Sequence, residues 1–153
     1  MATRCSNALR QQLLDIGESP GNWADFFQKW KDQGLTGEYR NYFFGKDSAY
    51  HTPKLTSPND RLMHVHLVPI LDQGALVAWE QAWRRRTRKV SNRVLVYADN
   101  RKGEYLLIYV LNEPDAHSIA AMQTVEDAET MAFLAQVAEA LRECPDFCVR
   151  GAG

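Results

Sequence analysis

The chain has 153 residues and a mass of 17.5 kDa, which corresponds to a single domain. Hydrophobic residues make up 45% and charged residues 24% of the sequence, close to globular averages, so a disordered or fibrous protein is excluded. The formal net charge of −1 argues against a protein that coats nucleic acid through bulk positive charge. The sequence shows no apolar run that would cross a bilayer and no secretory signal, so we expect a cytoplasmic protein without membrane contact.

The first part of the chain predicts two helices. Apolar residues recur at helical spacing from 7 to 16, and Gly and Pro residues at 17–21 end that segment. Asn22 is expected to cap the second helix. That helix carries an aromatic stripe, which we interpret as core instead of a base-stacking platform because an exposed stripe would be a costly apolar patch. The stripe consists of Trp23, Phe26, Phe27 and Trp30. Residues 1–22 form an N-terminal helical extension in this interpretation.

Residues 35–60 are rich in Gly, Pro, Ser, Asn and Asp, and they predict a long loop with short extended pieces. A loop of that length inside a compact domain is unusual unless it is functional. Its middle, residues 42–50, combines aromatic side chains with Lys46 and Asp47. We therefore expect 35–60 to be a functional loop.

A strand is predicted from Leu62 to Val68. Alternate residues of a strand point to opposite faces of a sheet, so Met63, Val65 and Leu67 share one face. His64 and His66 then project side by side from the other face. Pro69 ends the strand.

The rest of the chain predicts helices around a hairpin. A helix is expected from Ala75 to Lys89, followed by strands at 94–98 and 105–111 that form a hairpin. A short helix starts at Pro114 and carries His117, and a capped amphipathic helix completes the fold. The inward face of that last helix has Met131, Leu134, Ala135, Ala138 and Leu141.

The predicted fold is one α+β domain over residues 1–153. A small antiparallel sheet of about three or four strands packs with the N-terminal helices and the C-terminal amphipathic helix. Residues 143–153 are predicted to be a flexible tail, in which Cys144 and Cys148 are free thiols, with a regulatory disulfide as the alternative.

The near-zero net charge hides two segments of opposite sign. From Leu76 to Lys102 there are eight cations and two acids, whereas from Asn112 to Phe147 there are eight acids and one Arg. The cationic run near the end of the predicted helix can be a solvated face or can bind phosphate, for which Arg offers a planar donor fork. The candidate phosphate-binding residues are Arg84, Arg85, Arg86, Arg88, Lys89, Arg93 and Lys46.

His64 and His66 allow three interpretations. They can form a half-buried pair bonded to the backbone, or bind a metal, although no third ligand stands at a convincing spacing. They can also perform acid/base chemistry near neutral pH, which RNA cleavage needs, because the 2′-hydroxyl loses a proton and the leaving 5′-oxygen gains one. No Gly-rich phosphate loop, nucleophile elbow or zincin motif is present, so we expect neither a metal nor a cofactor.

Several short motifs occur in a characteristic order. They are Phe44-Gly45-Lys46-Asp47-x-x-Tyr50, Met63-His64-Val65-His66-Leu67, Leu95-Val96-Tyr97, Leu106-Leu107-Ile108 and Glu113-Pro114-x-x-His117, followed by an amphipathic helix through Ala138-Glu139. In this order the sequence resembles the YafO-type toxins, small bacterial toxins of type II toxin–antitoxin pairs. The resemblance covers about residues 23–142.

The resemblance implies an mRNA endonuclease that acts on translated message at the ribosome and is silenced by a cognate antitoxin. The polar positions that match the family pattern are Asp47, Tyr50, His64, His66 and His117. DNA contact is expected only through the antitoxin. The segment before Trp23, the Arg84–Lys89 run and the Cys-containing tail depart from the family pattern.

The leading hypothesis is a ribosome-associated mRNA interferase. His64 or His66 acts as general base or acid, His117 protonates the leaving group, and Asp47 orients a histidine. Tyr50 is a secondary proton donor or a base-stacking group. Two alternatives remain open: a non-catalytic module that inhibits its target through the basic helix and the Phe43-Phe44 loop, and a binding domain for a small anionic ligand.

Overall fold

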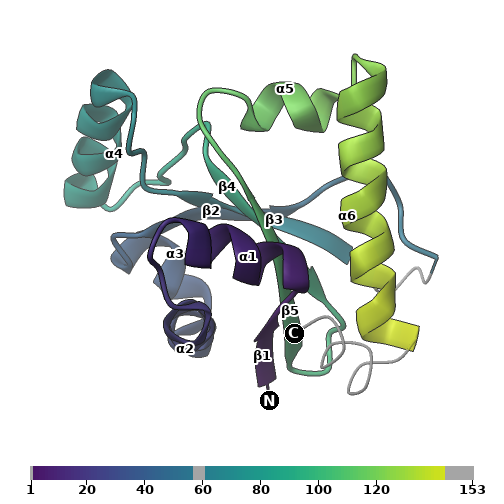
Figure 1. Ribbon diagram of the computed structural model, residues 1–153. Helices are drawn as coiled ribbons and strands as arrows, with labels where there is room; N and C mark the ends of the chain where they lie inside the picture. The colour runs from purple at the N-terminus through teal and green to yellow at the C-terminus, as the bar shows by residue number, and fades with distance from the viewer. Residues whose placement is uncertain (1, 57–60, 144–153) are drawn as a thin grey trace.

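The computed structural model describes residues 2–56 and 61–143 (Figure 1). The elements in chain order are β1 (Ala2–Cys5), α1 (Asn7–Asp15), α2 (Pro20–Asp32), the 3₁₀ turn η1 (Gly34–Thr36), α3 (Gly37–Arg40), β2 (Phe44–Ala49), β3 (Arg61–Leu67), α4 (Gln73–Arg85), β4 (Val94–Asp99), β5 (Glu104–Leu111), α5 (Ala116–Ala121) and α6 (Val125–Glu143). The predicted α+β class is confirmed. No helix in these two stretches is long and apolar enough to span a membrane.

The sheet has five strands in the order β1-β5-β4-β3-β2. All neighbours are antiparallel except β1 and β5, which run parallel. The predicted hairpin is the β4–β5 pair, in which Val94 lies opposite Leu111. The two outer strands were not predicted. Residues 1–22 therefore contribute an edge strand as well as helices. The stretch predicted as a long loop with short extended pieces contains α3 and β2, and η1 overlaps its start.

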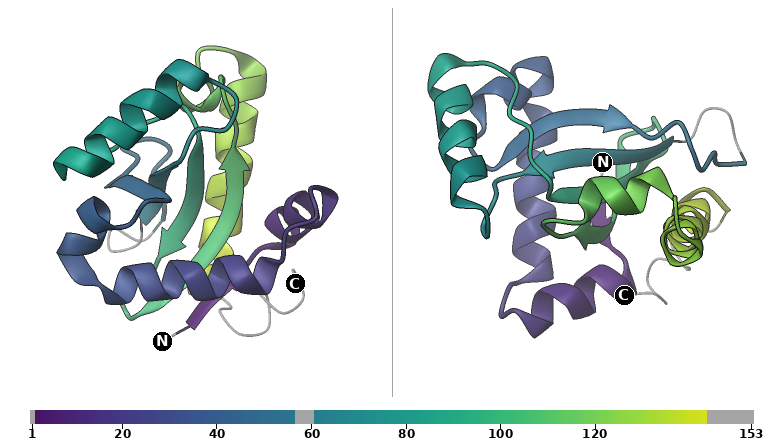
Figure 2. Two further views of the ribbon diagram at one scale, coloured as in Figure 1. Left: turned by 90° about the vertical axis from the view of Figure 1, so that its left-hand side faces the viewer. Right: turned by 90° about the horizontal axis from the view of Figure 1, so that it is seen from above.

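Helices cover both faces of the sheet (Figure 1, Figure 2). On one face α1 and α2 bury Leu9 and Phe27 against Val65, Leu95 and other sheet residues. On the other face α5 and α6 bury a second cluster, which includes Val94, Val96, Met131, Leu134 and Ala138. Of the predicted inward face of α6, Met131, Leu134 and Ala138 are buried and Ala135 is half-buried, whereas Leu141 lies outside the described side chains.

Side-chain caps set the starts of the helices. The Ser19 hydroxyl accepts from the Asn22 amide, so α2 begins at Pro20, and the predicted cap at Asn22 is wrong by one turn of helix. Thr124 accepts from the Asp127 amide ahead of α6, as the sequence predicted. Within the aromatic stripe, Phe27 and Trp30 are buried, whereas Phe26 remains 39% exposed.

Helix α4 is shorter than the sequence predicted. It ends at Arg85, and Arg86 adopts a left-handed conformation with φ of 58° that turns the chain. Arg88 and Lys89 therefore lie beyond the helix. Trp79 of α4 is buried, and its Nε1 donates to the Tyr42 carbonyl, which holds α4 beside the segment leading into β2. The predicted tail with Cys144 and Cys148 lies outside the described residues.

Candidate active site

Three of the four histidines gather on one face of the sheet. His64 and His66 of β3 lie opposite Val96 and Val94 of β4, so they share the face that α5 and α6 partly cover. The ring centroids of His64 and His66 are 5.7 Å apart, and those of His66 and His117 are also 5.7 Å apart. His66 thus lies between the other two imidazoles. We call these three residues the histidine row.

His64 occupies one end of the row. Its ring stacks on Tyr50, with centroids 4.0 Å apart and planes inclined by 11°, and its Nε2 lies 3.3 Å from the Ser48 hydroxyl. Burial, together with the charges of His66, His117 and Lys46, lowers the pKa of His64 to about 4. Its Nδ1 is buried without a hydrogen-bond partner. His64 is therefore a neutral base at neutral pH whose available nitrogen is Nε2.

His66 is held by the backbone of the turn before β4. Its Nδ1 lies 3.0 Å from the Ser91 amide nitrogen and 2.7 Å from the Ser91 carbonyl oxygen, so either tautomer finds a partner. Burial lowers the pKa of His66, and the Ser91 carbonyl opposes that change. When Nδ1 accepts from the Ser91 amide, Nε2 carries the proton and can donate to a ligand.

His117 lies on α5 and is exposed. Its position depends on Asn92, whose side-chain oxygen accepts from the His117 amide at 2.8 Å and whose nitrogen donates to the Pro114 carbonyl. The same turn therefore places two histidines, because Ser91 holds His66 and Asn92 holds the start of α5.

Lys46 places a cation beside the row. Its amide donates to the Lys89 carbonyl at 2.8 Å, which fastens β2 to the chain that follows α4. This contact requires glycine at the preceding position, because a Cβ on Gly45 would clash with the Lys89 carbonyl and lie 2.8 Å from the Trp79 ring. The charge of Lys46 acts on both His64 and His66.

The arrangement suits proton transfer next to an anion. It combines two imidazoles whose pKa values are lowered, an exposed third imidazole and a lysine on one partly open face. Within the described residues, no three His, Cys, Asp or Glu side chains are grouped as metal ligands.

A model of a known protein family matches residues 28–143, and it describes the toxin YafO of a type II toxin–antitoxin system. The chain belongs to the YafO toxin family. No curated protein and no solved structure matches the chain. Membership in this family implies a cognate antitoxin as partner.

Asp47 of this YafO-family toxin lies on the opposite face from the histidines. It pairs with Val65 in the sheet, and its carboxylate accepts from Tyr97 Oη at 2.6 Å and binds Lys31 Nζ at 2.6 Å. Alternation along β2 sends Ser48, not Asp47, to the side of His64. The hypothesis that Asp47 orients a histidine is therefore wrong, because both carboxylate oxygens serve a structural network under α2.

Tyr50 joins the row through its ring. Its predicted role as a proton donor or a base-stacking group stays a prediction. The ring stacks on His64, and burial raises the pKa of the phenol. The hydroxyl therefore stays protonated at neutral pH.

The predicted phosphate-binding cations divide into two groups. Arg84, Arg85, Arg86 and Arg88 are exposed on and after α4, although Arg88 also approaches Glu38, with Nε 3.6 Å from Oε2. Lys89 and Arg93 are buried instead. Lys89 donates to the Glu38 carbonyl and Arg93 to the Val68 carbonyl, so these two are not surface cations as the sequence suggested.

Sequence reasoning missed three residues of the site: Ser48, Ser91 and Asn92. Ser48 meets His64 only because β2 pairs with β3, and β2 was not recognised as a strand. Ser91 and Asn92 lie in the connection between α4 and β4, for which the sequence predicted no role. Small polar residues in that connection were the only available signal.

Proposed function

We propose that this YafO-family toxin is an endoribonuclease that cleaves translated mRNA at the ribosome, with the histidine row as its active site. The observation that carries the proposal is the row itself, three adjacent imidazoles with a lysine on one side of the sheet. The cytoplasm, where messages are translated, is the place of action, and protein residues supply the chemistry without a metal or cofactor.

His64 is the general base. A base must be unprotonated when substrate binds, and the lowered pKa of about 4 keeps this imidazole neutral at cellular pH. Its Nε2 takes the proton of the ribose 2′-hydroxyl as the 2′-oxygen attacks the adjacent phosphorus. Tyr50 fixes the ring plane through the stack and closes one side of the site.

His66 and Lys46 bind the phosphate, and His117 is the acid. The Nε2 of His66 donates to a phosphate oxygen while Ser91 holds Nδ1, and Lys46 offsets the negative charge of the phosphorane. The phosphorus–5′-oxygen bond then breaks, and the exposed His117 gives its proton to the leaving oxygen. The products are a 2′,3′-cyclic phosphate and a 5′-hydroxyl.

The exposed arginines supply association with the ribosome. Arg84, Arg85 and Arg86 lie at the end of α4, on the opposite side of the molecule from the acidic helix α6 (Figure 1). This separation lets a chain with a net charge of −1 approach ribosomal RNA with one side. Phosphate contacts are weak individually, and the net charge of the toxin does not hold it on RNA. In this proposal the ribosome positions the toxin on the message.

The test uses purified toxin in a reconstituted translation reaction with one defined message. We expect the wild type to cut the message only while it is translated, and to leave 5′-hydroxyl and cyclic phosphate ends, as mapped by primer extension and end labelling. A double variant, His64→Ala with His66→Ala, is expected to lose cleavage by about 10²–10⁴-fold. It should also fail to arrest growth on expression.

The matched control is His51→Ala. His51 is the fourth histidine, it is exposed, and it lies outside the row, so its loss should leave cleavage unchanged. Unaffected translation with wild-type protein, or full activity of the double variant, would show that the assignment is wrong. Growth arrest that survives loss of the histidines but not reversal of Arg84, Arg85 and Arg86 would support a toxin that acts by binding.

A further inference from the structure

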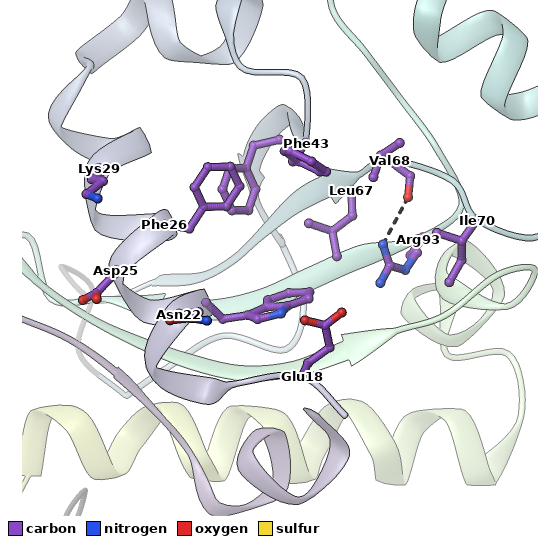
Figure 3. Close-up of a pocket in the computed structure, with 12 residues that line it drawn as sticks. Glu18, Asn22, Asp25, Phe26, Lys29, Phe43, Leu67, Val68, Ile70 and Arg93 are labelled. Atoms are coloured by element: carbon purple, nitrogen blue, oxygen red, sulfur yellow. Dashed lines mark hydrogen bonds between the residues drawn. The ribbon is translucent and has the colours of Figure 1, made fainter. Parts of the chain in front are cut away.

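A large groove opens on the face of the sheet that the histidines do not use (Figure 3). Its volume is about 600 Å³, and α2, the segment before β2 and the end of β3 line it. Leu67 lies in its floor and belongs to the core cluster under α1 and α2, as does Phe44. His64 and His66 point the other way, so the groove and the histidine row are separate sites.

The groove is apolar at its centre. Phe26 and Phe43 pack edge to face with ring centroids 5.3 Å apart, and Phe26 also contacts Phe44. Phe26 is 39% and Phe43 49% exposed, and Ile70 at the far end is 56% exposed. Exposed aromatic and aliphatic side chains gathered around a concavity are typical of a docking site for a partner.

The charges around the groove are mixed. Lys29 and Asp25 lie together on α2 at one end, and Glu18 and Arg93 lie at the other (Figure 3). Two acids and two cations repel an extended phosphate backbone as much as they attract it. A polypeptide that carries side chains of both signs around an apolar stretch complements this pattern.

Arg93 supplies a specific recognition point. It is only 8% exposed, its Nη1 donates to the Val68 carbonyl, and its Nε has no partner. A guanidinium has five N–H donors, so Arg93 keeps unused donors at the wall of the groove. A carboxylate or main-chain carbonyl of a bound segment would satisfy them.

We propose that this groove is the docking site for the cognate antitoxin, which inserts an amphipathic segment with apolar side chains onto Phe26 and Phe43 and an acceptor onto Arg93. The inference rests on membership in the toxin–antitoxin family and does not depend on the cleavage chemistry. The segment bound in the groove lies on the opposite face of the sheet from the histidine row. Neutralisation through this groove therefore does not require that the antitoxin fill the active site.

The experiment measures binding of purified full-length cognate antitoxin to toxin variants by calorimetry. Phe43→Ser is compared with Phe133→Ser, because Phe43 and Phe133 are 49% and 50% exposed and Phe133 lies on α6, away from the groove. We expect Phe43→Ser to raise Kd at least about tenfold and Phe133→Ser to change it less than about twofold. Thermal unfolding confirms that both variants fold.

A second pair tests the charges. Lys29→Glu should weaken antitoxin binding, whereas Lys54→Glu, another exposed lysine, should not. In cells, the Phe43→Ser toxin should arrest growth and escape neutralisation. If antitoxin binding depends on the groove but the wild-type toxin cleaves no message, the proposed cleavage function is contradicted and the docking site is supported.

Other results would overturn the docking site. Equal antitoxin affinity of Phe43→Ser and wild type would do so. Loss of a toxin dimer in Phe43→Ser with antitoxin affinity unchanged would assign the groove to a second copy. Loss of ribosome or RNA binding with antitoxin affinity unchanged would assign it to nucleic acid.

Discussion

The side chains that β2 and β3 send to the two faces of the sheet differ in how their polar groups are bonded. On the α2 side, Lys31 and Tyr97 bind the two carboxylate oxygens of Asp47. An apolar groove lies beside this network, and Arg93 Nε at its wall has no partner. On the α5 side, His64 has an unpartnered ring nitrogen, and burial keeps it neutral. A strand with alternating side chains thus builds a stable support on one face and leaves reactive groups on the other.

The largest expected loss of stability comes from Gly45, a residue of β2 whose neighbours Phe44 and Lys46 belong to the groove and to the histidine site. Gly45→Ala puts a Cβ against the Lys89 carbonyl and the Trp79 ring, which are backbone and a buried aromatic that yield little. We expect a loss of roughly 2–3 kcal/mol in the free energy of unfolding, measured by urea denaturation. Cleavage and antitoxin binding should weaken together, because Lys46 and Phe44 flank this residue.

The control for this change is Gly21→Ala. Gly21 lies in the first turn of α2, and a Cβ there meets only the Ser19 hydroxyl oxygen at 3.8 Å. Stability should stay the same or rise slightly. A Gly45→Ala protein as stable as Gly21→Ala would mean that the contact of β2 with the Lys89 segment is not rigid.

Asp47→Ala tests whether the α2 face of the sheet can be destabilised without changing the chemistry of the histidine face. It removes the partner of Lys31 and leaves the buried Tyr97 hydroxyl without an acceptor, so we expect about 2 kcal/mol of lost stability by the same denaturation. Cleavage per folded molecule should remain, because the carboxylate points away from the histidines. Asp25→Ala, an exposed acid on α2, serves as the control for stability. A cleavage defect larger than the folding defect would restore a catalytic role for Asp47.

The histidine face should make the fold sensitive to acid. The pKa of His64 is about 4 in the folded chain and near its ordinary value of 6.5 when unfolded, so the unfolded state binds more protons between these values. Stability is therefore present above pH 6.5 and is lost as the pH falls towards 4. Because His64 is only partly buried, we expect about 1 kcal/mol from this group.

The measurement is denaturant unfolding of wild type and His64→Gln at neutral pH and near pH 5. The variant should lose about 1 kcal/mol less than the wild type over that interval. His51→Gln, which changes an exposed histidine outside the row, should follow the wild type. Parallel losses in wild type and His64→Gln would show that His64 is not held neutral by the fold.

The smallest effect concerns association. Arg85→Glu with Arg86→Glu should weaken ribosome binding on the order of threefold to tenfold at physiological salt, with a shallower salt dependence, and should leave the cleavage site unchanged. Co-sedimentation with ribosomes measures the change. Arg10→Glu is the matched control, since Arg10 is also exposed but lies on α1, away from α4 (Figure 1). Equal weakening by both would indicate a general charge effect and no defined basic surface.

The histidine face was largely predictable from the sequence. Period-two alternation in 62–68 placed His64 and His66 together, and the continuous apolar runs predicted the central β4–β5 hairpin. The position of His117 beside them was not predictable from periodicity, because it depends on the Asn92 bond to the start of α5. His117 was identified as a candidate site residue only through the resemblance to the motifs of the YafO-type toxins.

The edges of the sheet and the groove were not predictable, for a physical reason. β2 contains glycine, lysine, aspartate and serine, so its strand character comes from pairing with β3 and not from local preference. Asp47 was misassigned in consequence, since its face depends on that register. Lys89 and Arg93 looked like surface cations because their partners are backbone carbonyls, which leave no mark in the side-chain pattern.

The first strand also sets the order in which the molecule can be completed during synthesis. β1 pairs with β5 from Ala2–Glu104 to Cys5–Leu107, so its partner is made only after most of the chain has left the ribosome. Until then Leu9 and Leu13 lack the β5 residues against which α1 packs. In the nascent chain, β1 and α1 therefore stay without their partners until β5 has been synthesised. The five-stranded sheet can be completed only late in the synthesis of this toxin.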